Sequence, residues 1–160
     1  QAIEFRVEPT DVDTRLTCDR DRMLQVFRNL LSNAAKLSRP ASTVTILFAD
    51  AALRFATSSG GTSLRAALAI GIRDHGVGIP DDELDSIFDK FVQSSKTKNN
   101  AGGTGLGLAI CQQIIDGHRG AIVAKNNRDG GATFTVTLPR AKTPRPTVAS
   151  CANLSPDEPT

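Results

Sequence analysis

The chain of 160 residues is long enough to bury one substantial core, and its 39% hydrophobic and 22% charged residues are ordinary for a globular protein. A net charge of +2 is too small to indicate nucleic-acid binding or a basic membrane-binding surface. No apolar run approaches 18 residues and no signal-peptide pattern is present, so we expect this domain to be cytoplasmic and without direct membrane contact, with a membrane anchor elsewhere in a parent protein left open.

The first predicted elements are two strands and a long helix. Residues 3–8 alternate apolar and polar side chains, which predicts a half-buried strand, and a short second strand is expected around residues 15–18. Asp19 is suited to cap the N-terminus of the helix that follows. Along that helix the apolar residues form one stripe at helical spacing: Met23, Val26, Phe27, Leu30, Leu31, Ala34 and Leu37.

Three polar residues, Asn29, Asn33 and Lys36, lie along one flank of this stripe because a helix has 3.6 residues per turn. Asparagine is a mediocre helix former, so two of them one turn apart need a reason. One interpretation is that both simply face solvent. The other is that their amide oxygens are hard ligands for Mg²⁺ while Lys36 meets a phosphate.

A hairpin is expected next, with strands over residues 43–48 and 64–73 and a Ser-Ser-Gly-Gly turn at 58–61. Its second strand leads into Asp74, Gly76 and Gly78. A carboxylate followed by Gly-x-Gly supplies an acceptor where the backbone can approach a planar ligand closely. An Asp-initiated turn explains the same residues without a ligand.

A short helix is predicted to begin at residues 80–83, and a long polar segment follows over residues 92–101. This composition is typical of a mobile lid and also of plain disorder, and its position beside a glycine-rich loop favours the lid.

Four glycines within residues 102–107 run into the helical pattern Leu106, Ala109, Ile110 and Ile114. Backbone N–H groups at a helix start favour negative charge, so this loop is predicted to hold phosphates. The spacing matches neither a P-loop nor a dinucleotide-binding fingerprint. The helix is expected to end near residues 116–117, with Gly117 as its C-cap.

The last predicted strands cover residues 121–125 and 132–138, on either side of a turn at 127–131. Alternation of threonine with apolar residues over 133–138 predicts one core-facing side. Prolines are frequent beyond residue 138, so we predict a domain over residues 1–140 and a disordered tail or linker over 141–160.

Taken in order, five segments resemble the motifs of the catalytic, ATP-binding domain of bacterial-type sensor histidine kinases. Residues 29–36 resemble the N box, 74–78 the first glycine box, 87–91 the F box, 103–108 the second glycine box and 130–134 the closing glycine motif. The resemblance implies an α/β two-layer sandwich of the Bergerat type, in which a mixed sheet carries helices on one face and a mobile lid covers ATP. It also implies a phosphoacceptor histidine on a separate dimerisation domain of the same parent protein, and indirectly a response regulator receiver domain.

The resemblance further implies individual roles. Asp74 is expected to accept a hydrogen bond from the adenine amino group, Asn33 to hold Mg²⁺, and Asn29 and Lys36 to line the phosphate side. The other residues expected to bind ATP are Gly76, Gly78, Ile79, Phe88, Lys90, Phe91, Gly103, Thr104, Gly105, Leu106, Gly107 and Leu108.

Three positions depart from the family pattern: Leu37 replaces a frequent aromatic residue, Gln93 a frequent arginine, and Arg119 a glycine. Neither His75 nor His118 is placed like a phosphoacceptor, so we expect the catalytic half of a larger protein. Three alternatives stay open: an ATPase of the gyrase, MutL or Hsp90 kind, an anti-sigma-type serine kinase, and a non-catalytic nucleotide-binding module. Asn29 argues against the first, because it provides no carboxylate to activate water.

Overall fold

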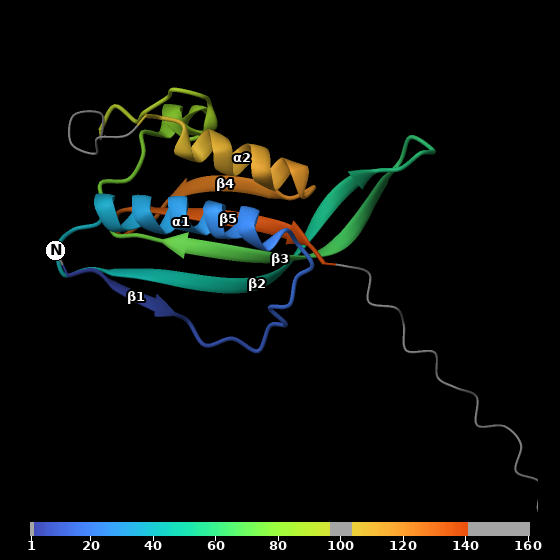
Figure 1. Cartoon of the computed structure of the whole chain (residues 1–160), viewed down its shortest axis with the longest axis horizontal. Helices are drawn as coiled ribbons and strands as arrows, with labels where there is room; N and C mark the ends of the chain where they lie inside the picture. The colour runs from blue at the N-terminus through green and yellow to red at the C-terminus, as the bar shows by residue number, and fades with distance from the viewer. Residues whose placement is uncertain (1, 97–103, 141–160) are drawn as a thin grey trace, which may run out of the picture.

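A five-stranded mixed sheet with two helices against one face forms the domain (Figure 1). The computed structural model describes residues 2–96 and 104–140. The sheet order is β1-β2-β3-β5-β4, with β1 and β2 parallel and the other pairs antiparallel. The strands are β1 (Glu4–Val7), β2 (Thr43–Ala56), β3 (Thr62–Arg73), β4 (Ala121–Asn126) and β5 (Ala132–Pro139). The helices are α1 (Arg20–Leu37) and α2 (Gly107–Gly117), and two short 3₁₀ turns, η1 (Asp81–Glu83) and η2 (Ser86–Phe88), precede α2. The predicted two-layer α/β sandwich is confirmed.

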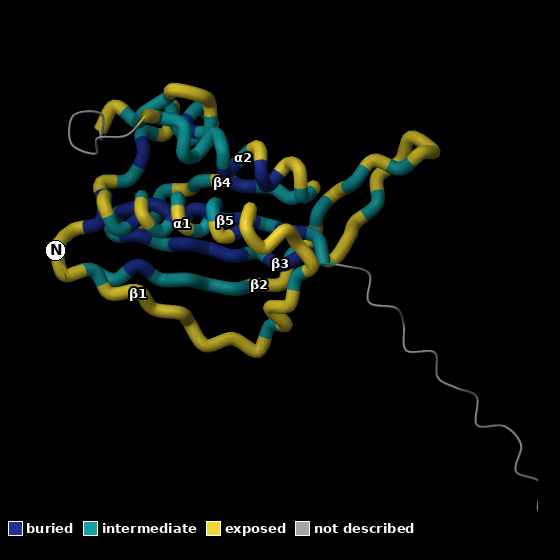
Figure 2. The backbone as a smooth tube through the Cα atoms, in the orientation of Figure 1, coloured by how far each residue is buried: buried dark blue, intermediate teal, exposed yellow. Residues whose placement is uncertain are grey.

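Helix α1 forms as the stripe predicts. The Asp19 carboxylate accepts hydrogen bonds from the backbone N–H groups of Asp21 and Arg22 and so caps the first turn. The buried members of the stripe are Met23, Val26, Leu30 and Ala34. Figure 2 shows the buried residues concentrated between the helices and the central strands.

The sheet contributes the opposite side of this core. Along β5 the alternating residues Phe134, Val136 and Leu138 are buried, as the pattern predicts. The register pairs Ile70 with Val136 and Ile72 with Phe134, so β3 and β5 present one continuous apolar face to the helices.

Two predictions near the N-terminus are wrong. All four residues of β1 are exposed, because β1 is an edge strand that pairs only with β2 and is not covered by a helix. Residues 15–18 form no strand; they belong to the connection that leads from β1 to the capping residue of α1.

The predicted hairpin is present, but it is longer than the sequence suggests. Strand β2 continues to Ala56 and β3 begins at Thr62, whereas β3 pairs with β5 only from Ala67 onward. The distal part of the hairpin therefore projects from the domain as a two-stranded arm (Figure 1).

Gly117 is not the left-handed residue at the end of α2, which corrects the predicted C-cap. Arg119 takes that conformation with φ of 56°, and its N–H donates to the Asp116 carbonyl at 2.8 Å. The N–H of Gly120 then reaches the Ile115 carbonyl at 2.9 Å, which closes the helix end.

The predicted tail at residues 141–160 and half of the predicted lid, residues 97–101, lie outside the described residues. Among the described residues, no helix is long and apolar enough to cross a bilayer.

Candidate functional site

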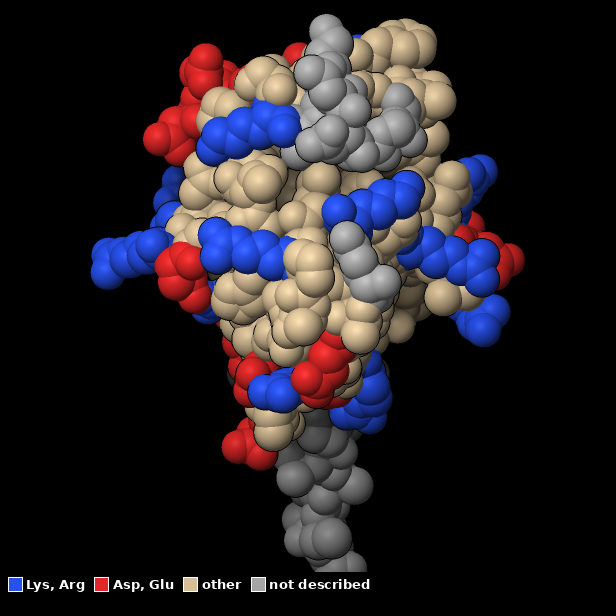
Figure 3. Space-filling model, turned by 90° about the vertical axis from the view of Figure 1, so that its left-hand side faces the viewer, with Lys and Arg blue, Asp and Glu red and all other residues tan. Residues whose placement is uncertain are grey.

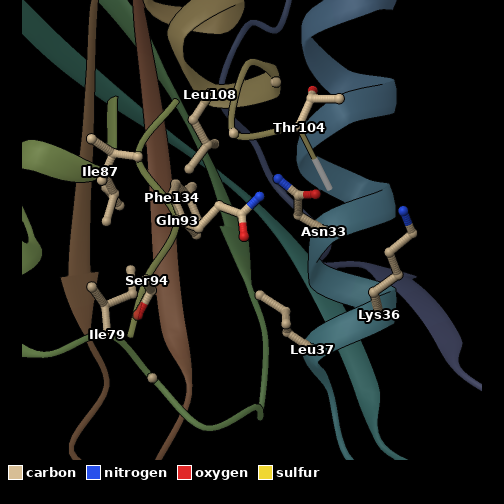
Figure 4. A pocket seen from close by; sticks show the side chains of 14 residues that line it. Asn33, Lys36, Leu37, Ile79, Ile87, Gln93, Ser94, Thr104, Leu108 and Phe134 are labelled. Atoms are coloured by element: carbon tan, nitrogen blue, oxygen red, sulfur yellow. The ribbon is translucent and has the colours of Figure 1, made fainter. Parts of the chain in front are cut away.

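A cavity of about 250 Å³ opens between the C-terminal half of α1, the start of α2, and the loop after β3 (Figure 4). It brings together segments that are far apart in the sequence. Eight of the predicted site residues line it: Asn33, Lys36, Gly78, Ile79, Thr104, Gly105, Gly107 and Leu108.

The three polar residues on the flank of α1 do not all reach the cavity. Asn33 points into the cavity toward Gln93, whereas Lys36 extends along the outer side of the helix at the cavity edge (Figure 4). Asn29 does not line the cavity. Its side-chain Nδ2 donates to the Gly107 carbonyl at 3.3 Å, so Asn29 joins α1 to the first residue of α2.

Asp74 is a buried carboxylate at the end of β3, with 4% of the residue exposed. Its Oδ1 accepts the backbone N–H of Gly76 at 2.8 Å and that of Ala132 at 3.1 Å. Within the described part of the chain no group donates to Oδ2. Burial raises the pKa of Asp74, and the two backbone hydrogen bonds partly oppose this shift.

Gly76 allows the loop after Asp74 to pass the end of α1. A Cβ at this position would lie 2.5 Å from the Leu37 carbonyl oxygen, so a side chain would force the loop away from the helix. Asp74 and Gly76 are not among the cavity-lining residues. They hold the loop that carries Gly78 and Ile79, which do line it.

The glycine-rich loop is held at Gly105, which has φ of 70°. Its carbonyl accepts the N–H of Phe91 at 3.0 Å, and a Cβ there would lie 2.8 Å from the Phe91 carbonyl carbon. Leu106 is the residue before the first turn of α2, and Gly103 lies outside the described residues.

Three residues of the F box, Phe88, Lys90 and Phe91, lie beside the cavity rather than in its wall. Phe88 packs edge-to-face on Phe134 with ring centroids 6.3 Å apart. Lys90 is exposed, and Phe91 is 74% exposed in a left-handed conformation with φ of 65°. The neighbouring Ile87 does line the cavity.

The first residues of the predicted lid are anchored to the same loops. Both carboxylate oxygens of Glu83 accept the N–H of Ser95, at 3.1 and 3.2 Å. Lys96 Nζ donates to the Val77 carbonyl at 3.4 Å. Val92, Gln93 and Ser94 consequently form one side of the cavity.

Comparison with known proteins identifies the architecture around this cavity. The family model described as "Histidine kinase-, DNA gyrase B-, and HSP90-like ATPase" matches residues 18–142. The chain belongs to this family. Within the family it corresponds to the ATP-binding catalytic domain of sensor histidine kinases, as the resemblance predicts.

Several relatives of this ATPase-family domain are sensor kinases. Sensor histidine kinase WalK of Bacillus subtilis (strain 168) is 34% identical over 140 residues, which cover 87% of this chain and 21% of WalK. The catalytic domain of histidine kinase ThkA matches with a TM-score of 0.65 and 28% identity over 86% of this chain and 80% of that one. Full-length ShkA in complex with AMPPNP matches with a TM-score of 0.60 and 26% identity over 86% of this chain and 25% of that one. The chain thus spans about a fifth of the length of WalK.

The ATPase-family site contains four further lining residues that sequence reasoning did not assign to the ligand: Ile87, Val92, Ser94 and Phe134. Phe134 belongs to the closing glycine motif and Ile87 to the F box, so the motifs could have indicated both residues as part of the cavity wall. Leu37 and Gln93, which depart from the family pattern, also line the cavity.

Proposed function

We propose that this chain is the catalytic half of a protein-histidine kinase, which binds ATP with Mg²⁺ and donates the γ-phosphate to a histidine on a separate dimerisation domain of its parent protein. This proposal rests on one observation: Asn33, the glycine-rich loop and the loop after Asp74 line the same cavity. Phosphorylation of a response regulator from that histidine and a cytoplasmic location belong to the same proposal.

The ligand would lie with adenine toward the loop after Asp74 and phosphates toward α2. No group in residues 2–96 or 104–140 donates to Asp74 Oδ2, which would accept from the adenine amino group, and the glycines after Asp74 carry no side chain that would keep the base away from the backbone. The N-terminus of α2, with Thr104, Gly105 and Gly107 beside it, offers backbone N–H groups to phosphates. Figure 3 shows Lys and Arg side chains spread over this end of the molecule, which suits a polyanion.

The residues present fit a magnesium ion. Asn33 directs its amide into the cavity near Thr104 (Figure 4). Among the described residues no group of three His, Cys, Asp or Glu is placed to hold a metal. Mg²⁺ keeps several waters and uses substrate phosphates with few protein ligands, so one amide oxygen suffices. When bound, the ion would neutralise charge on the phosphates.

The two histidines of the chain are unsuited to accept the phosphoryl group. His118 Nδ1 lies 2.8 Å from the Ile114 carbonyl, and its Nε2 accepts the backbone N–H of Asp19 at 3.1 Å. His75 Nδ1 lies 4.0 Å from an Asp129 carboxylate oxygen, in the loop assigned to adenine. The chain therefore positions ATP, and the nucleophile must come from another domain.

The test is phosphoryl transfer with labelled ATP and Mg²⁺, with and without the dimeric helical hairpin of the same parent protein. We expect label only on the hairpin, acid-labile and alkali-stable as phosphohistidine is. Asn33→Ala should abolish transfer by misplacing Mg²⁺, whereas Gln113→Ala, an exposed change on α2, should leave it unchanged.

Each alternative function gives a different result in this assay. Phosphate release without the hairpin would indicate an ATPase, and an acid-stable product would indicate a serine kinase. Binding of ATP without transfer to the hairpin would indicate a regulatory module. Rapid self-labelling of the isolated chain would also contradict the proposal.

A further inference from the structure

Asn126, the last residue of β4, holds the loop that forms one side of the cavity. Its Oδ1 accepts the backbone N–H of Ile79 at 2.9 Å, and its Nδ2 donates to the Ile79 carbonyl at 2.6 Å. The same Nδ2 donates to Asp81 Oδ1 at 2.9 Å. Asn126 is itself not among the cavity-lining residues and is outside every motif that points to ATP.

These contacts act on the part of the loop that faces the ligand. Gly78 and Ile79 both line the cavity, and Ile79 is only 8% exposed. The Oδ1 of Asn126 also lies 3.0 Å from where a Cβ on Gly78 would stand, so the amide packs directly against both residues.

The other end of the loop is held by the same turn between β4 and β5. Asn126 pairs with Ala132 in the sheet register, and the Ala132 N–H donates to Asp74 Oδ1 at 3.1 Å. The adjacent Asn127 donates through Nδ2 to the Asp74 carbonyl at 3.0 Å. One turn therefore sets the distance between the Asp74 carboxylate and the Ile79 backbone.

We propose that Asn126 is a positioning residue for the adenine end of the nucleotide. The proposal rests on the function proposed above. An asparagine amide supplies a donor and an acceptor from one planar group, which matches the N–H and C=O of a single residue. The Asp81 carboxylate accepts only, so it fixes which side of the amide carries the donor.

The first experiment measures ATP and ADP dissociation constants by calorimetry for the wild type, Asn126→Ala and the control Lys125→Ala, an exposed change on the same strand. Removal of the Asn126 amide leaves the N–H and C=O of Ile79 without the hydrogen bonds that Asn126 made to them. We therefore expect the affinity for nucleotide to fall about tenfold in Asn126→Ala. The factor should be the same for ATP and ADP, because both carry the adenine end. The control should bind like the wild type.

Transfer kinetics provide a readout that general loss of stability would not move. In Asn126→Ala the KM for ATP should rise about tenfold, while kcat at saturating ATP stays within about twofold. Unchanged affinity in a folded Asn126→Ala protein, or a loss confined to ATP, would overturn the inference.

If Asn126→Ala does not fold, the inference can be tested by exchanging the amide and the carboxylate between positions 126 and 81. Asn126→Asp should weaken binding further, since it places a carboxylate against the Ile79 carbonyl and Asp81. Adding Asp81→Asn should recover part of that loss, because the new amide can donate to the carboxylate at position 126. Absence of any recovery would contradict the proposal.

A wild type that binds no ATP would refute the proposed function itself, whereas wild-type binding with equal binding by Asn126→Ala would refute only this inference.

Discussion

The hydrogen bonds and burial of the Asp74 carboxylate indicate which ligand group it can bind. The hydrogen bonds that its side chain accepts from the described residues come from two backbone N–H groups and converge on one carboxylate oxygen, which leaves the other for an amino group. Burial of this carboxylate means that its interactions are little screened by solvent. Single substitutions at this position should therefore have large and specific effects.

Asp74→Asn should weaken ATP binding by roughly one to two orders of magnitude. A hydrogen bond to a charged acceptor contributes roughly 1.5–3 kcal/mol, and about 1.4 kcal/mol corresponds to one decade. Calorimetry on the folded variant measures this, with Asp82→Asn as an exposed control. Equal affinities for wild type and Asp74→Asn would remove Asp74 from the adenine site.

The stability of the ligand-free protein should depend on pH through the same group. Because burial raises the pKa of Asp74 in the folded state, the folded protein holds this proton more tightly than the unfolded chain does. The wild type should gain stability relative to Asp74→Asn as the pH falls through the raised pKa toward the ordinary value of 3.8. Denaturant unfolding of both proteins at several pH values measures this difference. A constant difference would show that the folded-state pKa is not raised.

The end of α2 shows how an element can carry local strain. Arg119 holds a left-handed conformation that glycine adopts without steric cost. The chain accepts it because Arg119 and Gly120 then donate to the Asp116 and Ile115 carbonyls at the end of the helix.

Arg119→Gly should raise the free energy of unfolding by about 0.5–1 kcal/mol. Relief of left-handed strain contributes about 1–2 kcal/mol, and the greater freedom of glycine in the unfolded chain offsets about half of it. Denaturant unfolding measures the change. Gln113→Gly, at an exposed position inside α2, should instead destabilise by about 1 kcal/mol. A destabilising effect of Arg119→Gly would mean that the arginine side chain contributes more than its backbone costs.

The centre of the sheet and the projecting β2–β3 arm differ in how many neighbouring strands they pair with. Residues 67–73 of β3 have a neighbouring strand on both sides, whereas the β2–β3 hairpin beyond them has only its own cross-strand pairs. A two-stranded hairpin is marginally stable by itself in water. The site depends on the centre, since none of its lining residues lies in the arm.

Replacement of residues 54–64 by Asn-Gly should leave the fold and ATP affinity intact. Leu53 pairs with Arg65, so a two-residue turn can join them directly. The melting temperature should change little and the ATP dissociation constant by less than about twofold, because little buried surface is removed. Calorimetric scanning and titration measure both. Loss of ATP binding in a folded, shortened protein would show that the arm contributes to the site.

The sequence by itself determined the features that depend on neighbouring residues. The stripe of α1, its Asp19 cap, the alternation of β5 and the glycine-rich start of α2 all follow from spacing and backbone chemistry within one segment. The ordered motifs also indicated the family and eight residues of the cavity wall.

Only the tertiary structure decided the features that depend on residues distant in the chain. Asn126 is 47 residues from Ile79, and Asn29 is 78 residues from Gly107, so no local pattern indicates either contact. The exposure of β1 follows from its place at the sheet edge, and the arm follows from where β3 loses its pairing with β5. Periodicity specifies which face of an element is apolar, but the positions of the other elements decide whether that face is covered and which side chains reach the cavity.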